Sequence, residues 1–282
     1  MKLANAVILI IAHKETLTPH EEISLQQVHR VLGHYPIWLI CPRGLDLAAY
    51  RAVVPEVQVD FIDPKWQASY AAFNQLKVQP FLYQRYRTYE YLLYYELDAF
   101  VFRDELAYWC EQGYDYIGAP WFSDYNQPQE DVNASLKDIG NGGFSLHRIS
   151  SSLDVCFRLS WIRRPHEIWS DYTSMNWRGR IKHVPWLIRQ FTLGNNTFHW
   201  FNDLILGEDY YWGVQVPRNF QWFRVATVEE ALRFSFELKP AKKYELNQKT
   251  LPFGCHAWEK WDLDFWRPHI EKYGYRISHN NQ

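Results

Sequence analysis

Short apolar runs alternate with helix signals through the first hundred residues, and this alternation limits the folds that the chain can adopt. Residues 7–11 are rich in β-branched side chains, as buried parallel strands are, and residues 37–40, 57–62 and 91–95 predict three more strands. Helices are expected between them, which gives a β-α-β-α order. The pattern predicts an α/β fold with a Rossmann-like, mostly parallel sheet and helices on both faces.

The first expected helix has clear signals at both ends. Thr18 is a typical N-cap, Pro19 stands in the first turn, and Glu21 and Glu22 lie near the positive end of the helix dipole. Gly33 is expected to end the helix after about residue 32. Further helices are predicted at residues 65–76, 80–88, 150–161, 229–234 and 264–273, short strands at 115–118 and 144–147, and a polar loop at 123–138.

Composition excludes several classes of protein. The net charge of −2 argues against a protein that binds nucleic acid by neutralising phosphates. The four cysteines show no C-x-x-C spacing, which argues against a zinc knuckle or a disulfide framework and favours a reducing, cytoplasmic compartment. The apolar run at residues 3–12 is shorter than the roughly 20 residues of a membrane span. No repeat or Gly/Ser-rich linker divides the 282 residues, so one continuous domain is expected.

Two acids follow the fourth predicted strand. Glu96 and Asp98 are spaced i and i+2, so both can reach one divalent cation, which prefers hard oxygen ligands. Acids in so apolar a stretch are costly to bury unless they are paired or bound to a metal. The alternative is a carboxylate pair that caps a neighbouring helix or binds Arg103. His13 follows the first predicted strand, at the same expected edge of the sheet, where ligands of parallel sheets bind.

Three further motifs carry candidate residues. The glycines Gly142 and Gly143 precede a strand and let a ligand approach the backbone, although Asn-Gly is also an ordinary turn signal. Glu208 and Asp209 stand at a helix start, where acids are common, and Asp209 is a candidate general base. His256 lies between aromatic and small residues and is a candidate metal ligand or phosphate donor, or else a core histidine.

These motifs, taken in order, resemble metal-dependent glycosyltransferases of the GT-A fold that use nucleotide sugars. The chain is more closely similar to the bacterial DUF5672 family. The resemblance covers roughly residues 5 to 260 and is carried by YELDAFVFRDEL (95–106), YDYIGAPW (114–121), GNGGFSL (140–146), Glu208-Asp209 and PFGCH (252–256).

The resemblance implies which residues bind the nucleotide-sugar donor and what each of them does. Asp98 would be the main ligand of Mn²⁺ or Mg²⁺ on the donor diphosphate, and His256 would complete the metal site or hold the diphosphate. Glu96 stands at the first acid of the D-x-D pattern and, being one methylene longer, would touch the metal, the ribose or a metal-bound water. Ala12 and His13 would border the nucleotide base.

The resemblance also implies the reaction and its acceptor side. Gly142 and Gly143 would line the donor-sugar and acceptor pocket, and Asp209, beside Glu208, would be the base of an inverting reaction. The donor would be a nucleotide-diphosphate sugar, a UDP-sugar in the first instance, and the acceptor a surface polysaccharide or lipid-linked glycan. Residues up to about 105 would form the nucleotide-binding half and those from about 106 an irregular acceptor half.

Two other functions compete with this hexosyltransferase-type interpretation. Glu96 and Asp98 also suit a metal-dependent nucleotide-sugar hydrolase or nucleotidyltransferase. The aromatic content of 18% suits a carbohydrate-binding module. In the transferase interpretation, the rings of Trp121, Tyr210, Tyr211 and Trp212, beside the motifs, would stack on pyranose rings. The Trp- and Arg-rich residues 161–200 are left open as an acceptor platform, a surface facing the inner side of a membrane, or a dimer surface.

Overall fold

The fold centres on one twisted sheet with helices on both faces. The computed structural model describes residues 5–124, 134–158, 161, 163–192, 194–197 and 207–277. Within this part of the chain the main sheet has the order β3-β2-β1-β4-β9-β6. Its strands are β1 (Ala6–Ile11), β2 (Ile37–Pro42), β3 (Gln58–Ile62), β4 (Tyr91–Tyr95), β6 (Tyr116–Ile117) and β9 (Phe144–Arg148). The first four are parallel, and β9 is antiparallel to both β4 and β6. The predicted α/β class with a mostly parallel sheet and helices on both faces is confirmed.

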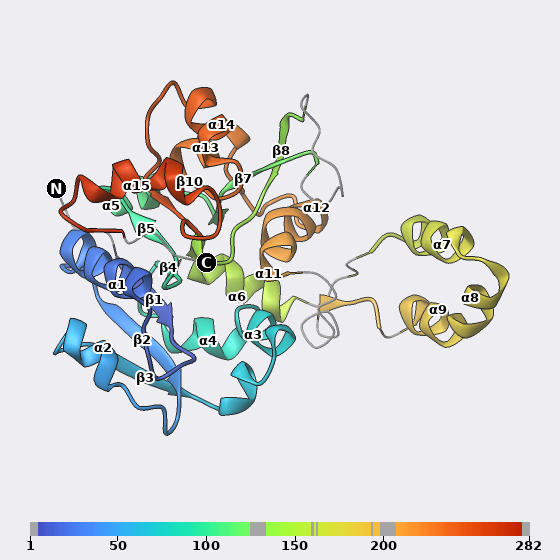
Figure 1. Ribbon diagram of the computed structural model, residues 1–282. Helices are drawn as coiled ribbons and strands as arrows, with labels where there is room; N and C mark the ends of the chain where they lie inside the picture. The colour runs from blue at the N-terminus through green and yellow to red at the C-terminus, as the bar shows by residue number, and fades with distance from the viewer. Residues whose placement is uncertain are drawn as a thin grey trace.

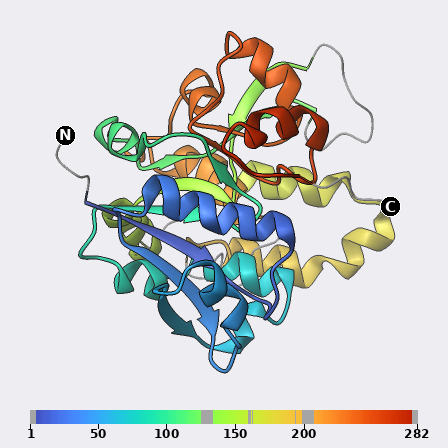
Figure 2. The same cartoon turned by 60° about the vertical axis from the view of Figure 1, so that its left-hand side comes forward.

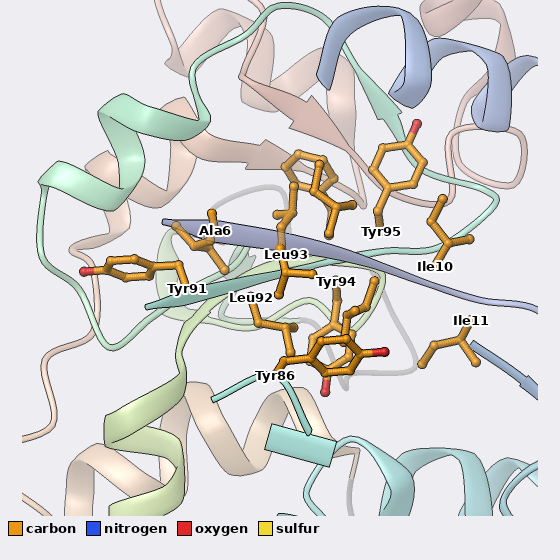
Figure 3. Close-up of a cluster of buried hydrophobic side chains, with 14 of the residues drawn as sticks. Ala6, Ile10, Ile11, Tyr86, Tyr91, Leu92, Leu93, Tyr94 and Tyr95 are labelled. Atoms are coloured by element: carbon orange, nitrogen blue, oxygen red, sulfur yellow. The ribbon is translucent and has the colours of Figure 1, made fainter. Parts of the chain in front are cut away.

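Residues of β1 and β4 form the centre of the core because helices cover both of their faces. All side chains of these two strands are buried, and each large apolar one contributes about 1.5–3 kcal/mol by leaving water. Side chains alternate along β4, so Tyr95 and Tyr94 point to opposite faces (Figure 3). The Tyr95 hydroxyl contacts Ser24 of α1 (Pro19–Leu32), and Tyr94 lies beside Tyr83 of α4 (Pro80–Arg85).

The predicted first helix is confirmed at both ends. Thr18 caps α1 by accepting from the Glu21 backbone N–H at 3.2 Å, while the Glu21 carboxylate accepts from the Thr18 N–H at 2.8 Å. Gly33 follows the last residue of the helix. Such a reciprocal pair satisfies two backbone donors that have no partner within the helix. The remaining helices of this half are α2 (Ala48–Val53), the 3-10 turn η1 (Pro64–Gln67) and α3 (Tyr70–Leu76).

Two small sheets bring late segments of the chain to the end of β4. In one of them, β11 (Gly254–Cys255) lies between β10 (Ser235–Phe236) and β5 (Phe100–Val101). Because β5 follows β4 after only four residues, the segment after β11 reaches the loop between them, where the Trp258 N–H donates to the Asp98 carbonyl at 3.3 Å. The other small sheet pairs β7 (Pro120–Phe122) with β8 (Leu136–Ile139).

The last helix, α15, and the residues after it pack beside α1, as the views in Figures 1 and 2 agree. Arg30 donates to the Tyr273 carbonyl at 2.6 Å, and the Tyr275 hydroxyl donates to Gln27 at 3.0 Å. The helices beyond β5 are α5 (Leu106–Glu111), α6 (Ile149–Phe157), α7 (Pro165–Ser174), α8 (Trp177–Lys182), α9 (Val184–Phe191), α11 (Glu208–Tyr210), the π-helical η2 (Tyr211–Gln215), α12 (Val216–Asn219), α13 (Val228–Phe234), α14 (Pro240–Leu246) and α15 (Leu263–Glu271).

Several sequence-based boundaries differ from the structure. The helix predicted at 65–76 is divided into η1 and α3, and the one predicted at 80–88 ends at Arg85. The predicted polar loop at 123–138 is wrong at its end, because Leu136–Ile139 is a strand whose backbone pairs with β7; its residues 125–133 lie outside the described part. The helix predicted at 150–161 ends at Phe157, since Arg158 has an extended backbone. The residues 163–192, which had no predicted order, form α7, α8 and α9. No helix among the described residues is long and apolar enough to span a bilayer.

Candidate functional site

The acid pair lies where β4 leaves the sheet. Glu96 and Asp98 occupy a turn in which the Ala99 N–H donates to the Glu96 carbonyl at 2.9 Å. The Glu96 N–H in turn donates to the Gly143 carbonyl at 2.8 Å, which joins the acid pair to the glycine turn. The two carboxylates keep 23% and 33% of their side-chain surface exposed, although Tyr95 and Ala99 on either side are buried. The turn therefore presents both acids to the same opening in the surface.

His256 comes from the far end of the chain and meets this pair. Its Nε2 lies 3.2 Å from Asp98 Oδ1 and 3.6 Å from Glu96 Oε2. One ligand atom from each of these three side chains lies within 4.8 Å of the others. The remaining ring nitrogen, Nδ1, is 3.3 Å from Glu237 Oε1, a carboxylate contact that orients metal-binding histidines in many sites. Burial alone would lower the pKa of His256, but the carboxylates, Asp98 foremost, raise it well above its ordinary value.

A buried lysine, which the sequence interpretation missed, sits behind the acid pair. Lys77 is 1% exposed, and its ammonium donates to Glu96 Oε1, to the Gly142 carbonyl at 2.9 Å and to Glu208 Oε1 at 3.1 Å. Burial would lower the pKa of Lys77, but the charges of Glu208 and Glu96 outweigh it and raise the pKa well above its ordinary value. The lysine in turn holds the pKa of Glu96 well below its usual range against the opposite effect of burial.

The Lys77 contacts change the interpretation of two acids. Glu96 does not bind Arg103, as the structural alternative supposed, because Arg103 contacts Glu105 and the carbonyls of Leu251 and Pro252. Glu208 is buried and engaged with the lysine. The sequence does contain one signal that this lysine is buried. Lys77 stands between the apolar Leu76 and Val78, in the short connection between two predicted helices.

Replacing Lys77 by methionine is expected to lower the free energy of unfolding by about 3–5 kcal/mol, as removing one partner of a buried ion pair does. The substitution keeps the apolar stem but leaves the buried Glu208 carboxylate without its cation. Urea titration followed by circular dichroism would measure the loss. Adding Glu208→Gln to Lys77→Met should restore part of the stability. A loss below about 1 kcal/mol for Lys77→Met would contradict this account.

The glycine turn allows the charged side chains to come this close. A Cβ on Gly142 would overlap the Glu208 carboxylate, and a Cβ on Gly143 would overlap the His256 ring. Asn141 holds the turn in place, since its side-chain oxygen accepts from the backbone N–H groups of Gly143 at 3.0 Å and Phe144 at 3.2 Å. The segment is therefore a tight turn, and charged side chains of the chain itself pack against its two glycines. That these glycines line a pocket for the sugars stays a prediction.

Asp209 differs from its neighbour Glu208 in its surroundings. It makes no ion pair within the described residues, and its Oδ1 accepts from the Tyr210 N–H at 2.8 Å. Burial, followed by the nearby charges of Glu208 and Glu237, raises the pKa of Asp209 to about 7. Because Glu237 also contacts His256, the influence of that carboxylate connects Asp209 electrostatically with the His256 side of the site. A carboxyl group with this pKa can hold and release a proton near neutral pH.

A cavity of about 430 Å³ opens beside the acid pair at the carboxyl ends of β1 and β4. Besides Glu96 and Asp98, two more carboxylates, of Glu21 and Glu259, line the cavity. The other lining residues are apolar, aromatic or uncharged polar side chains: Ile11, His13, Gln67, Ser69, Tyr70, Phe73 and Leu97. Ala12, the other predicted nucleotide contact, is buried, and its carbonyl accepts from the Gln67 side chain at 2.8 Å.

Aromatic residues at the cavity are not the ones that the sequence predicted. Trp212 and Tyr211 are core side chains, 0% and 1% exposed, so they present no face to a sugar. Their ring area is buried where η2 packs into the core. Trp121 is also buried and stacks on Tyr210, with ring planes 9° apart. Tyr70, which is 80% exposed at the cavity, was not among the predicted residues.

Several solved structures are similar to this chain at low sequence identity. A galactosyltransferase, LgtC, in complex with donor and acceptor sugar analogues is 11% identical over 97% of this chain and 98% of its own, with a TM-score of 0.46. Mouse xyloside xylosyltransferase 1 is 12% identical over 88% and 96%, also with a TM-score of 0.46. Core-mannan synthase A from Aspergillus fumigatus, in a Mn/GDP form, is 10% identical over 76% and 70%, with a TM-score of 0.40.

A search of curated proteins found no match. A family model described as "Protein of unknown function (DUF5672)" matches residues 56–256, which is more than half of the chain and includes Glu96, Asp98, Asp209 and His256. The resemblance indicated by the sequence motifs is thus confirmed at the level of the family, and the chain belongs to the DUF5672 family.

Proposed function

We propose that this chain is a metal-dependent glycosyltransferase, which moves a sugar from a nucleotide-diphosphate sugar to a hydroxyl group of a glycan or lipid-linked acceptor. The observation that carries the proposal is the meeting of His256 with Glu96 and Asp98, two acids that line the cavity at the carboxyl ends of parallel strands. Ligands of α/β sheets bind at this edge. Residues up to about 105 would bind the donor, and residues beyond them the acceptor.

The donor atoms in the site fit Mn²⁺ or Mg²⁺. Carboxylate oxygens are the ligands that such hard cations prefer, and an imidazole nitrogen suits Mn²⁺ as an additional ligand. Asp98 and His256 would hold the ion, and Glu96 would add Oε2, because its other oxygen is held by Lys77. When bound, the cation supplies Lewis-acid neutralisation of the charge that develops on the diphosphate leaving group.

The cavity offers the features that a nucleoside needs. Its 430 Å³ lies within the usual range of about 300–1,000 Å³ for small-molecule sites. Tyr70 and Phe73 supply ring faces for a base, while His13, Gln67 and Ser69 supply polar groups for the base and ribose. We take a UDP-sugar as the donor to test first. The volume accommodates the nucleoside end of such a donor, with its diphosphate toward Asp98.

Asp209 is the proposed general base. A carboxylate can remove the proton of an acceptor hydroxyl only when it is ionised, and it accepts that proton better when its pKa lies near the working pH. The raised pKa of Asp209, about 7, meets both needs. Glu208 would support the site through Lys77 rather than by proton transfer. Attack by an acceptor activated in this way would invert the configuration at the sugar carbon.

A thermal-shift screen of nucleoside diphosphates and their sugars, with and without Mn²⁺, tests the proposal. A ligand that binds only the folded state raises the melting temperature of the protein. We expect one nucleotide to stabilise the protein only when Mn²⁺ is present, and a sugar acceptor then to accelerate release of the nucleoside diphosphate. Release at the same rate without an acceptor would favour the hydrolase. No response to any nucleotide would contradict the transferase and favour the carbohydrate-binding module.

A further inference from the structure

Residues 163–192 form a helical arm that extends away from the main sheet (Figure 1). The arm consists of α7, α8 and α9, and α7 packs against α9. Its base is closed by hydrogen bonds between its two ends: the Arg163 N–H donates to the Asn195 side chain at 2.8 Å, and the Asn195 amide donates to the Arg163 carbonyl at 2.7 Å. Ile168 is the one residue of these three helices that is buried. The arm is therefore almost all surface.

Large apolar side chains form a stripe on the arm. Trp177, Ile181, Val184, Ile188 and Phe191 are all exposed, Ile181 by 66% and Ile188 by 59%. Trp177 and Ile181 are four residues apart on α8, and Val184, Ile188 and Phe191 are spaced by four and three on α9, so within each helix they share one face. α9 begins directly after α8, because the His183 N–H donates to the Gly179 carbonyl at the end of α8 and the His183 carbonyl accepts from the Leu187 N–H at the start of α9, both at 2.9 Å. Contiguous exposed apolar surface of this kind marks an interaction site.

The charge of the arm is opposite to that of the chain. It carries six basic residues and two acidic ones, a formal charge of +4, whereas the whole chain has −2. Both acids are engaged within the arm: Asp171 pairs with Arg163, and Glu167 accepts from the Arg164 N–H at 3.0 Å. The basic residues Arg178, Lys182 and Arg189 lie on the same two helices as the apolar stripe. A partner that fits this surface carries negative charge and, next to it, an apolar region that can take up the exposed side chains.

We propose that the helical arm docks this protein on an anionic lipid bilayer. Tryptophan, isoleucine and phenylalanine side chains on these helix faces insert to the level of the acyl boundary, while arginine and lysine beside them contact anionic headgroups. A second copy of the chain is disfavoured as the occupant, because two arms would bring +4 against +4. The inference stands on the arm alone and does not depend on the proposed reaction.

Sedimentation of the full chain with lipid vesicles tests the inference. We expect binding to vesicles of phosphatidylcholine mixed with phosphatidylglycerol, much weaker binding to phosphatidylcholine alone, and a decrease as salt is added. The double variant Ile181→Asp/Ile188→Asp should bind roughly tenfold more weakly or worse, since each side chain loses apolar transfer free energy. Leu246→Asp, at a 52% exposed apolar position on α14, is the matched control and should bind as the parent does.

The charge can be tested separately from the apolar stripe. Arg178→Glu/Lys182→Glu should abolish the preference for anionic vesicles, and because both positions are exposed the melting temperature should stay that of the parent. Equal binding of the parent to both kinds of vesicle, or unchanged binding by the Ile181→Asp/Ile188→Asp variant, would overturn the inference. Light scattering that shows a dimer in the parent and a monomer in that variant, without vesicle binding by either, would assign the stripe to self-association instead.

Discussion

Asp98→Asn is expected to weaken Mn²⁺-dependent nucleotide binding by about 100-fold or more, since even outer-shell changes around metal sites cost about 10–100-fold. The amide has nearly the same shape as the carboxylate but carries no charge, so it is a poor ligand for a hard cation. The fold should be little affected, because a third of the Asp98 side chain is exposed. Calorimetric titration of nucleoside diphosphate with and without Mn²⁺ would measure the change.

Asp264→Asn is the matched control for this prediction. The residue lies in the first turn of α15, its side chain is 89% exposed, and its ion pair with Arg267 is a surface contact. Surface pairs of this kind contribute about 0–1 kcal/mol. The control should therefore bind nucleotide like the parent. Metal-dependent binding of parental strength by Asp98→Asn would exclude Asp98 as the main ligand.

Asp209→Asn is expected to lower kcat by about 10²–10⁴-fold, the usual contribution of a general base, with little change in donor binding. The parent enzyme should lose activity as the pH falls through about 7, because the carboxyl group of Asp209 then becomes protonated. The variant should lack this acidic limb. Initial rates across pH, with the donor at saturation, would measure both effects.

Stability gives an independent readout for Asp209. Its folded-state pKa is raised, so the folded state holds the proton more tightly than the unfolded chain does, and the ionised form opposes folding. The contribution of Asp209 to the free energy of unfolding should fall as pH rises from about 4 to 7. Asp209→Asn should therefore gain stability relative to the parent across this range and be more stable than the parent at pH 8. Glu229→Gln, an exposed acid at the start of α13, should change neither rate nor stability appreciably. An unchanged pH–rate profile in Asp209→Asn would exclude the proposed base.

The sequence predicted local features of the fold well because short-range signals determine them. The β-branched run that became β1, the acid pair after β4 and the capping box of α1 each lie within a few consecutive residues. Such patterns report strand burial, strand ends and helix ends directly. The candidate residues Glu96 and Asp98 were found for the same reason.

The rest of the site depends on contacts between distant segments. His256 reaches Asp98 because β11 pairs with β5, a register that two-residue strands do not reveal in the sequence. Lys77 looks like an ordinary surface lysine until Glu208, 131 residues away, is placed against it. Trp212 was predicted at the sugar because its neighbours are acids, but η2 packs it into the core.

Lys77 also limits how this protein can be recombined. Its ammonium joins Glu96, from the first hundred residues, to Glu208, from the last eighty, so the late segment carries a buried carboxylate whose cation comes from the early one. A chimera that takes these segments from two family members will keep both ion pairs of the lysine only if the lysine and both glutamates, or a matched set of substitutes, are inherited together. The crossover point matters less than this three-residue inheritance, which makes the lysine a compatibility marker for building hybrids within the family.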